Sequence, residues 1–430
     1  MKRTNLTGKT LIIAGLSLSM VGGLTSCKKE GCTDSTATNY DEKAKKDDGS
    51  CEYPTPVTPT PTTPTQGAET KTGKITADET WTANNIYTLN GKVVVEDGVT
   101  LTIEPGTVIK GEAGTGANAT ALLVARGAKL MAEGTASLPI IFTSVADEIT
   151  PEDIAAGNFA SPNLDPTVNG YWGGVIVLGN APISASNDAD ADVTEVQIEG
   201  IPTSDQNGLY GGSDAADNSG SLAYISIRHG GSNIGSGNEI NGLSLGGVGS
   251  GTTIDNIEIV ANQDDGIEWY GGTVECTNMI TWNVGDDGLD TDQSWGGSCT
   301  NYITVTAAGH AFELDGPEGS MEDSHTFTNG SVIASNDDVA TQDLINTDDN
   351  SMVAINNLFI TAIVDGQVID TDGQGAGVTF DNVLLDVADV TAHTKSGAAV
   401  TGVSEGTTSQ ADASAFSWTW THAAGVISGL

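Results

Sequence analysis

A repeat in the middle of the chain is the strongest constraint on the fold. The segment DDGIEWYGGTVECTN (264–278) returns as DDGLDTDQSWGGSCTN (286–301), and Asn256, Asn278 and Asn301 lie 22 and 23 residues apart. Each of these asparagines is followed by a short β-rich segment. A repeat of this length is typical of a parallel β-helix, in which each repeat forms one rung and aligned residues stack about 4.8 Å apart. The sequence therefore predicts an all-β solenoid.

The rest of the body agrees with this fold class. The chain has 430 residues, of which 55 are glycine, and short β-rich segments alternate with Gly and Asn from about residue 73 onwards. No long segment shows the 3.6-residue period of an amphipathic helix. The single expected helical turn is TPEDIAAG (150–157), capped by Thr150, in an insertion loop over 149–166. At the end of the chain, Trp418 and Trp420 alternate with Thr, which predicts a strand that covers the last rung.

Two residue types follow the repeat and predict contacts between rungs. Cys276 and Cys299 both precede Thr-Asn, so stacking would bring their Cα atoms within the range of a disulfide. The aligned asparagines would form a ladder of side-chain amides. We therefore expect a Cys276–Cys299 disulfide between neighbouring rungs.

The N-terminus has the features of an export signal. Lys2, Arg3 and Lys9 precede an apolar segment (11–24) that is too short to cross a membrane comfortably. The segment ends in LTSC, which resembles a bacterial lipobox. This resemblance implies that residues 1–26 are removed, that Cys27 is acylated, and that the protein is anchored in the outer membrane by its lipid.

Composition divides the mature chain into three further parts. Without Cys27, four cysteines remain and form two local pairs, so a Cys32–Cys51 disulfide is expected to close a small module (27–53). A Pro/Thr-rich segment (54–72) predicts a semi-rigid, extended linker. The β-helix domain would then occupy 73–430.

Charge limits the partners. The chain holds 57 Asp and Glu against 16 Lys and Arg, which gives a net charge of −41. Such a body repels nucleic acid and anionic membrane surfaces. It attracts divalent cations with hard oxygen ligands, calcium above all.

Three parts of the chain resemble known families. VTLTIEPGTVIKG, ALLVARGAKLMAEG, LPIIFTS and YWGG resemble the early rungs of secreted right-handed β-helix proteins. GCTDSTATNYDEKAKKDDGSC (31–51) resembles a small module of exported Bacteroidota-type proteins. The segment YISIRHGG through WYGGTVE (224–275) resembles β-helix surface lipoproteins of the same bacteria. The resemblances imply a right-handed fold and exposure at the cell surface.

The repeated acids are the first candidate site. Stacking would form a ladder whose members are Asp264, Asp265, Glu268, Asp286, Asp287, Asp290, Asp292, Glu313 and Asp315. Crowded carboxylates need calcium between rungs or protonation of some members. Calcium ligands would be Asp264, Asp265, Asp286, Asp287 and Asp290. Asp264, Asp286 and Asp287 are also candidate catalytic acids. The alternative is that each DDG only forms a turn.

Aromatic residues beside Gly-Gly are the second candidate site. They are Trp172, Tyr210, Trp269, Tyr270 and Trp295. Flat aromatic faces beside carboxylates would suit a sugar ring. The alternative is packing at corners, where Gly-Gly lets neighbouring rungs approach closely.

Together, these features predict a non-enzymatic role in binding, adhesion or surface structure, with glycan or another surface ligand as partner and calcium as stabiliser. One alternative is a polysaccharide-active enzyme, either an acid-pair hydrolase or a calcium-assisted lyase. The lyase is disfavoured because residues 75–430 contain only six Lys and Arg to neutralise an anionic substrate. The remaining alternative is an accessory subunit that joins an outer-membrane barrel in an uptake complex.

Overall fold

A computed structural model describes residues 29–35, 37, 39–51, 67–187, 189–234, 239–348, 350–370 and 377–430. The expected signal peptide, Cys27 and residues 54–66 of the expected linker lie outside the described residues. The chain divides into two compact units, 1–63 and 64–430. The described helices include none that is long and apolar enough to cross a membrane.

The small N-terminal unit is closed by the expected disulfide. Cys32 and Cys51 are bonded, with their Cα atoms 4.8 Å apart. Asp47 and Asp48 accept hydrogen bonds from the backbone N–H groups of Gly49 and Ser50, at 3.0 Å each. These aspartates therefore stabilise a turn beside the disulfide.

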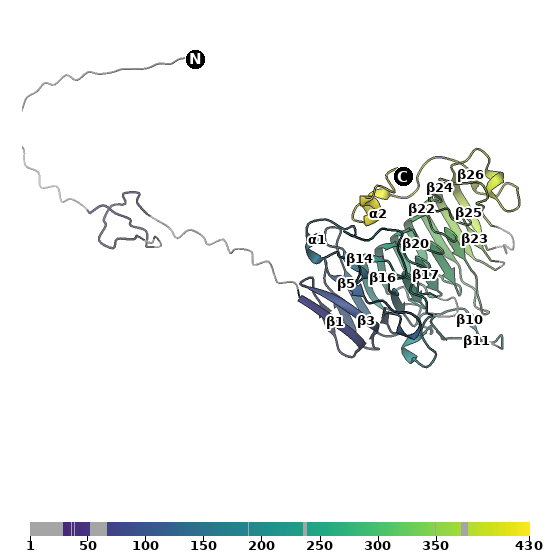
Figure 1. Cartoon of the computed structure of the whole chain (residues 1–430), viewed down its shortest axis with the longest axis horizontal. Coiled ribbons are helices and arrows are strands. Elements are labelled where there is room, and N and C mark those ends of the chain that lie inside the picture. Colours follow the sequence, from purple (N-terminus) through teal and green to yellow (C-terminus); the bar gives the residue numbers. More distant parts are fainter. Residues whose placement is uncertain are drawn as a thin grey trace, which may run out of the picture. The chain divides into compact units, whose positions relative to one another are not determined.

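The large unit is a right-handed parallel β-helix, as the repeat predicts. Twenty-two strands form one continuous, wholly parallel sheet, and they stack side by side in Figure 1. Its strands are β1 (Gly67–Ile75), β2 (Glu79–Trp81), β3 (Asn85–Val95), β4 (Thr100–Ile103), β5 (Val108–Gly111), β6 (Ala121–Val124), β7 (Lys129–Glu133), β8 (Ile140–Ser144), β9 (Val175–Leu178), β14 (Gly220–Arg228), β15 (Leu243–Gly246), β16 (Thr253–Val260), β17 (Ile267–Tyr270), β18 (Glu275–Trp282), β19 (Leu289–Asp292), β20 (Ser298–Val305), β21 (Phe312–Leu314), β22 (His325–Ile333), β23 (Asn346–Thr347), β24 (Val353–Thr361), β25 (Thr379–Leu385) and β26 (Val403–Glu405).

Several short elements lie outside the large parallel sheet. Two antiparallel hairpins pair β10 (Ala185–Ser186) with β11 (Asp192–Val193) and β12 (Val196–Gln197) with β13 (Leu209–Tyr210). The helical elements are α1 (Pro151–Ala155), α2 (Trp420–Ala423) and the 3-10 turns η1 (Gly116–Asn118), η2 (Gln206–Gly208), η3 (Val390–His393) and η4 (Ala413–Phe416). The expected Thr150 cap is present, because Thr150 and Asp153 exchange hydrogen bonds in a capping box.

An asparagine ladder marks the bend between two faces of the β-helix. Asn278, Asn301, Asn357 and Asn382 all have φ between 54° and 59°, in the left-handed region that Asn tolerates better than most residues. Asn301 donates to Asn278 at 2.6 Å, and Asn382 donates to Asn357 at 2.9 Å. The expected ladder therefore exists between Asn278 and Asn301 and recurs on later rungs, whereas Asn278 itself donates to Asp255 and not to Asn256.

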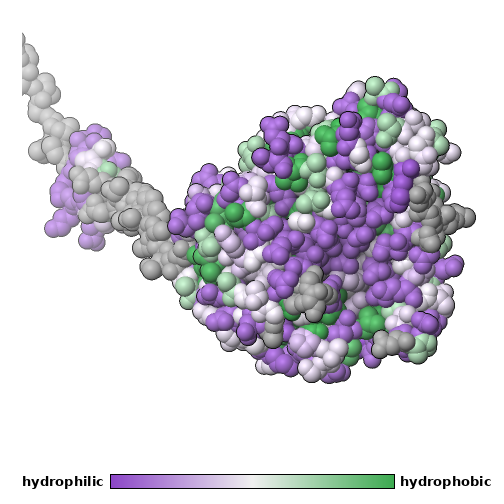
Figure 2. Space-filling model, turned by 45° about the vertical axis from the view of Figure 1, so that its right-hand side comes forward, coloured by the Kyte–Doolittle hydropathy of each residue, from purple (hydrophilic) through white to green (hydrophobic). Residues whose placement is uncertain are grey.

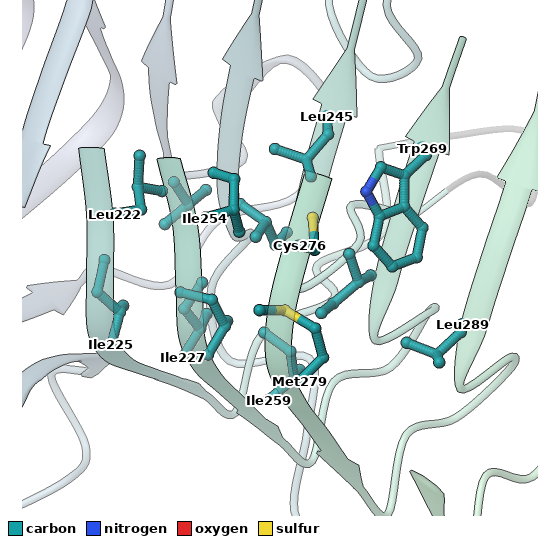
Figure 3. Packing of buried hydrophobic residues seen from close by; sticks show 14 of the residues in the cluster. Leu222, Ile225, Ile227, Leu245, Ile254, Ile259, Trp269, Cys276, Met279 and Leu289 are labelled. Atoms are coloured by element: carbon teal, nitrogen blue, oxygen red, sulfur yellow. The ribbon is translucent and has the colours of Figure 1, made fainter. Parts of the chain in front are cut away.

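Alternate residues of each strand point into the core. On the bent strands, Ile225, Ile257, Met279 and Tyr302 stack in register and are almost completely buried. Ile225 and Met279 are visible in Figure 3, together with Trp269 from β17. Each such side chain contributes about 1.5–3 kcal/mol through burial, so the stack stabilises the column of rungs.

The expected disulfide between rungs is not formed. Cys276 on β18 and Cys299 on β20 are register partners, as the repeat predicts, but both are buried free thiols. In-register side chains of parallel strands project side by side, which keeps their Cβ atoms near the strand spacing of about 4.8 Å. A disulfide needs Cβ atoms about 3.8 Å apart. The alignment was therefore correct and the bond was wrong.

Two boundaries differ from the sequence interpretation. Strand β1 begins at Gly67, inside the segment expected to be linker, because 67–71 pair with β3.

Near the C-terminus, Trp420 begins a short helix instead of continuing a strand over the last rung. Phe416, Trp420 and Ile427 pack on outward-facing residues of β16, β18 and β20. Apolar side chains on the outside of these strands explain why the C-terminal segment covers their flank.

Candidate acidic site

One face of the β-helix aligns acidic side chains on successive rungs. On β17, β19 and β21, Glu268 pairs in register with Asp290, and Asp290 with Glu313. Their strand neighbours, such as Trp269, belong to the hydrophobic core. The two-residue period of a strand thus places acids outside and apolar residues inside.

The turns before these strands add a second acidic column. Asp265 Oδ1 accepts a hydrogen bond from the backbone N–H of Asp287 at 2.9 Å, and Asp287 Oδ1 accepts one from the backbone N–H of His310. Asp265 and Asp287 are buried, whereas Asp286 is exposed. The repeated DDG motif therefore serves as a turn and also brings carboxylates to a common site.

The two columns line one solvent-open cavity of about 200 Å³. All nine lining residues are acidic, namely Glu199, Glu239, Asp264, Asp265, Glu268, Asp286, Asp287, Asp290 and Glu313. Neither Lys nor Arg is among these described lining residues. The face of the molecule in Figure 2 is likewise covered mainly by hydrophilic residues.

Burial and mutual repulsion make most of these acids hard to ionise. Burial, reinforced by Glu199 and Glu239, raises the pKa of Asp264 to about 7. Burial raises the pKa of Glu268 to about 8, and burial together with Asp287 raises that of Glu313 to about 9. Burial and neighbouring carboxylates also raise the pKa values of Asp265, Asp286 and Asp290. A bound cation would offset this repulsion.

Asp287 and His310 behave differently from their neighbours. Burial acts to raise the pKa of Asp287, but interactions with His310 and Glu313 outweigh it and lower the pKa. Burial acts to lower the pKa of His310, but the nearby Asp287 carboxylate outweighs it and raises the pKa. The Asp287 carboxyl group therefore favours its ionised form more strongly than an isolated aspartate does.

Three groups of side chains place possible ligand atoms within 4.8 Å of one another. They are Asp264/Asp265/Asp286, Asp265/Glu268/Asp290 and Asp287/His310/Glu313. All five calcium ligands expected from the sequence therefore lie in these groups. The first two groups offer only carboxylate oxygens, which suit a hard divalent cation.

The expected aromatic platform is absent from the described surface. Trp172, Tyr210, Trp269, Tyr270 and Trp295 are all at least 93 % buried, since none exceeds 7 % exposure. Trp269 stacks on Trp295 inside the core, with ring centroids 4.7 Å apart. The burial of all five rings supports the packing alternative. On β17, Trp269 points into the core while its neighbour Glu268 faces the cavity. Only the hydroxyl of Tyr270 reaches the acidic site, where Asn241 donates to it at 3.2 Å.

Some site residues were not recognised in the sequence as members of this site. Glu199 follows the β12 strand and Glu239 precedes β15, so neither carries the 22-residue spacing. His310 does occupy the repeat position of Asp287, and its place in the third copy was the available signal. Glu239 accepts a hydrogen bond from the Asn233 amide, which positions it at the cavity.

Comparison with known proteins identifies the family. A family model described as a pectate-lyase-like beta-helix domain matches residues 73–157 and 159–425. Searches of curated proteins and of solved structures found no significant match. The match covers most of the chain and coincides with the stacked rungs described above. The chain therefore belongs to the pectate-lyase-like β-helix domain family.

Proposed function

We propose that this protein is a lipid-anchored, surface-exposed binding protein of the outer membrane, which uses calcium in its acidic cavity to bind a polysaccharide or a similar surface ligand. The observation that carries this proposal is the cavity itself, whose nine described lining residues are all carboxylic acids. The family description, pectate-lyase-like, is consistent with a polysaccharide as the ligand.

Calcium fits the donor atoms of the cavity. Ca²⁺ takes six to eight oxygen ligands in flexible geometry. Asp265 belongs to both all-carboxylate groups, so two ions would share it as a bridging ligand. A bound ion would hold the surrounding carboxylates ionised. Its remaining coordination positions would face the open side of the cavity, where hydroxyl or carboxylate oxygens of a glycan could bind.

Binding is favoured over catalysis by the size and lining of the cavity. Pockets that enclose organic ligands usually measure about 300–1,000 Å³, whereas this cavity measures about 200 Å³. The nearby tryptophans, Trp269 and Trp295, are buried in the core and offer no stacking face. These features support ion-mediated contact with the edge of a ligand.

Calcium titration tests the cavity. Isothermal titration calorimetry of the full chain should show calcium binding that Asp290→Asn weakens by at least about tenfold. Asp337→Asn, which changes an exposed acid elsewhere, is the matched control and should bind like the unchanged protein. Polysaccharide-coated beads should retain the unchanged protein and Asp337→Asn in the presence of calcium and release them when a chelator is added. Asp290→Asn should be retained less. Unchanged calcium affinity in Asp290→Asn would contradict the proposal.

The membrane anchor needs a separate test. Cells fed an alkyne-labelled palmitate should incorporate it into the protein, and Cys27→Ser should abolish labelling. External protease should then remove the β-helix from intact cells. Labelling that survives Cys27→Ser would exclude the lipobox interpretation.

A hydrolase remains the second candidate because Asp264 and Asp286 line the same open cavity. With a pKa of about 7, the Asp264 carboxyl group would be protonated in about half of the molecules at neutral pH, and a general acid needs such a proton. Incubation with neutral and acidic polysaccharides should be followed by measurement of new reducing ends. Activity that Asp286→Asn abolishes would make the protein an enzyme.

A further inference from the structure

The third copy of the repeated turn replaces the acid pair with Gly309 and His310. His310 lies one rung beyond Asp287, whose carboxylate accepts its backbone N–H. A side chain on Gly309 would collide with the carboxylates of Asp286 and Asp287. The absence of a side chain at Gly309 therefore leaves space for these two carboxylates, and Asp287 contacts the imidazole of His310.

The imidazole of His310 points at two carboxylates. Its Nδ1 lies 3.0 Å from Asp287 Oδ1 and 3.9 Å from Glu313 Oε1. His310 is only 8 % exposed. Among the described residues, Nδ1 makes no hydrogen bond of good geometry, and its contacts with these two carboxylates are ion-pair contacts. A buried nitrogen without a hydrogen bond, facing two carboxylates, is an arrangement that a bound cation would complete.

The opposite ring nitrogen is held by two amide side chains. Gln342 and Asn346 place their amide groups 3.3 and 3.5 Å from His310 Nε2. The NH₂ group of each amide faces Nε2, and rotation of the amide by 180° would present its oxygen instead, which accepts a hydrogen bond from Nε2–H. Metal-binding histidines typically donate their other ring N–H to such a neighbour, which fixes the orientation of the ring.

We propose that Asp287, His310 and Glu313 form a site for a first-row transition-metal ion of the Zn²⁺ type. Their ligand atoms all lie within 4.8 Å of one another. Calcium prefers oxygen alone, whereas an imidazole nitrogen with two carboxylates suits zinc and its neighbours. The site is distinct from the two all-carboxylate groups, and it does not depend on calcium occupying them.

Zinc titration in the presence of saturating calcium chloride tests this site, because calcium then fills the positions that prefer it. The full chain should bind zinc, and His310→Gln should weaken the affinity at least about tenfold. His422→Gln is the matched control, since His422 is an exposed histidine outside the cavity. Circular dichroism should show that both variants are folded. If His310→Gln is not folded, Glu313→Gln tests the same prediction.

The outcomes separate this proposal from the calcium proposal. Absence of zinc binding by the unchanged protein, or equal affinity in His310→Gln, would overturn the zinc site and leave His310 as an ion-pair partner of Asp287. Zinc binding that is lost in His310→Gln supports the site even where no calcium binds. In that case the calcium proposal fails alone.

Discussion

Asp265 Oδ1 accepts a hydrogen bond of 2.9 Å from the backbone N–H of Asp287, which lies one rung further along the β-helix. The same aspartate lines the acidic cavity and belongs to two groups of possible cation ligands. A single carboxyl group thus joins two rungs and contributes to the candidate site. Stability and cation binding should therefore be coupled at this position.

Replacement of Asp265 separates its two roles. In the presence of a chelator, Asp265→Ala should lower the free energy of unfolding by about 1–3 kcal/mol, because the backbone N–H of Asp287 loses its hydrogen-bond acceptor. Asp265→Asn keeps an acceptor oxygen and should cost less. Asp286→Ala, at an exposed position, is the control and should also cost less. Urea unfolding measures all three. An equal loss for Ala and Asn would show that the hydrogen bond contributes nothing.

Stability without calcium should fall as pH rises. The folded-state pKa values of Asp264, Glu268 and Glu313 are raised to about 7, 8 and 9. The folded state therefore holds more protons than the unfolded state, and the stability they contribute is lost between about pH 4 and pH 9. Asp287, with a lowered pKa, acts in the opposite sense only at acidic pH. Thermal unfolding in chelator from pH 5 to pH 9 should show a declining midpoint, and calcium should flatten the decline.

The two buried thiols should be protected. Burial raises the pKa of Cys276 to about 12, and Cys299 is completely buried beside it. A maleimide reagent should label neither residue in the native protein and both residues after denaturation. Peptide mapping by mass spectrometry under non-reducing conditions reads out the result. A peptide that links Cys276 to Cys299 would instead support a disulfide between the rungs.

Trp269 should act as a core residue. It is fully buried and stacks on Trp295, so Trp269→Ala should cost about 3–5 kcal/mol of unfolding free energy. Tyr171→Ala, at a position 38 % exposed, should cost less than about 0.5 kcal/mol. Chemical denaturation compares them. If Trp269→Ala were as stable as the unchanged protein but lost polysaccharide binding, the Trp269 ring would have to contact the ligand, contrary to this prediction.

The C-terminal segment should be held by a buried ion pair. Glu258 accepts hydrogen bonds from the backbone N–H and the hydroxyl of Thr421, and it lies 3.6 Å from Arg228, with both charged side chains inaccessible to solvent. Glu258→Ala would leave Arg228 buried without its partner, at a cost of about 3–5 kcal/mol. Glu275→Ala, an exposed acid on β18, is the control. Limited proteolysis should cleave 406–430 faster only in Glu258→Ala.

Local chemistry made much of the fold predictable. Asn256, Asn278 and Asn301 signalled the rung because asparagine tolerates the left-handed backbone that the bend requires. Tyr224 adopts the same conformation one rung earlier, with φ of 50°, and its side chain gives no such signal. The register of Cys276 with Cys299 also followed from spacing. Whether their sulfur atoms bond depends on the relative direction of the side chains, which spacing does not specify.

The sequence by itself determined the stacking of rungs, the length of the central rungs, and the asparagines and carboxylates that repeat with them. Only the tertiary structure decided which side chains meet. Trp269 and Glu268 are neighbours in sequence, yet one is in the core and the other faces the cavity, because side-chain direction alternates along a strand. Glu199 and Glu239 come from connections without the repeat, and their positions depend on how those loops fold back over the rungs. Periodicity records contacts between copies of one unit, whereas contacts made by irregular loops leave no periodic signal.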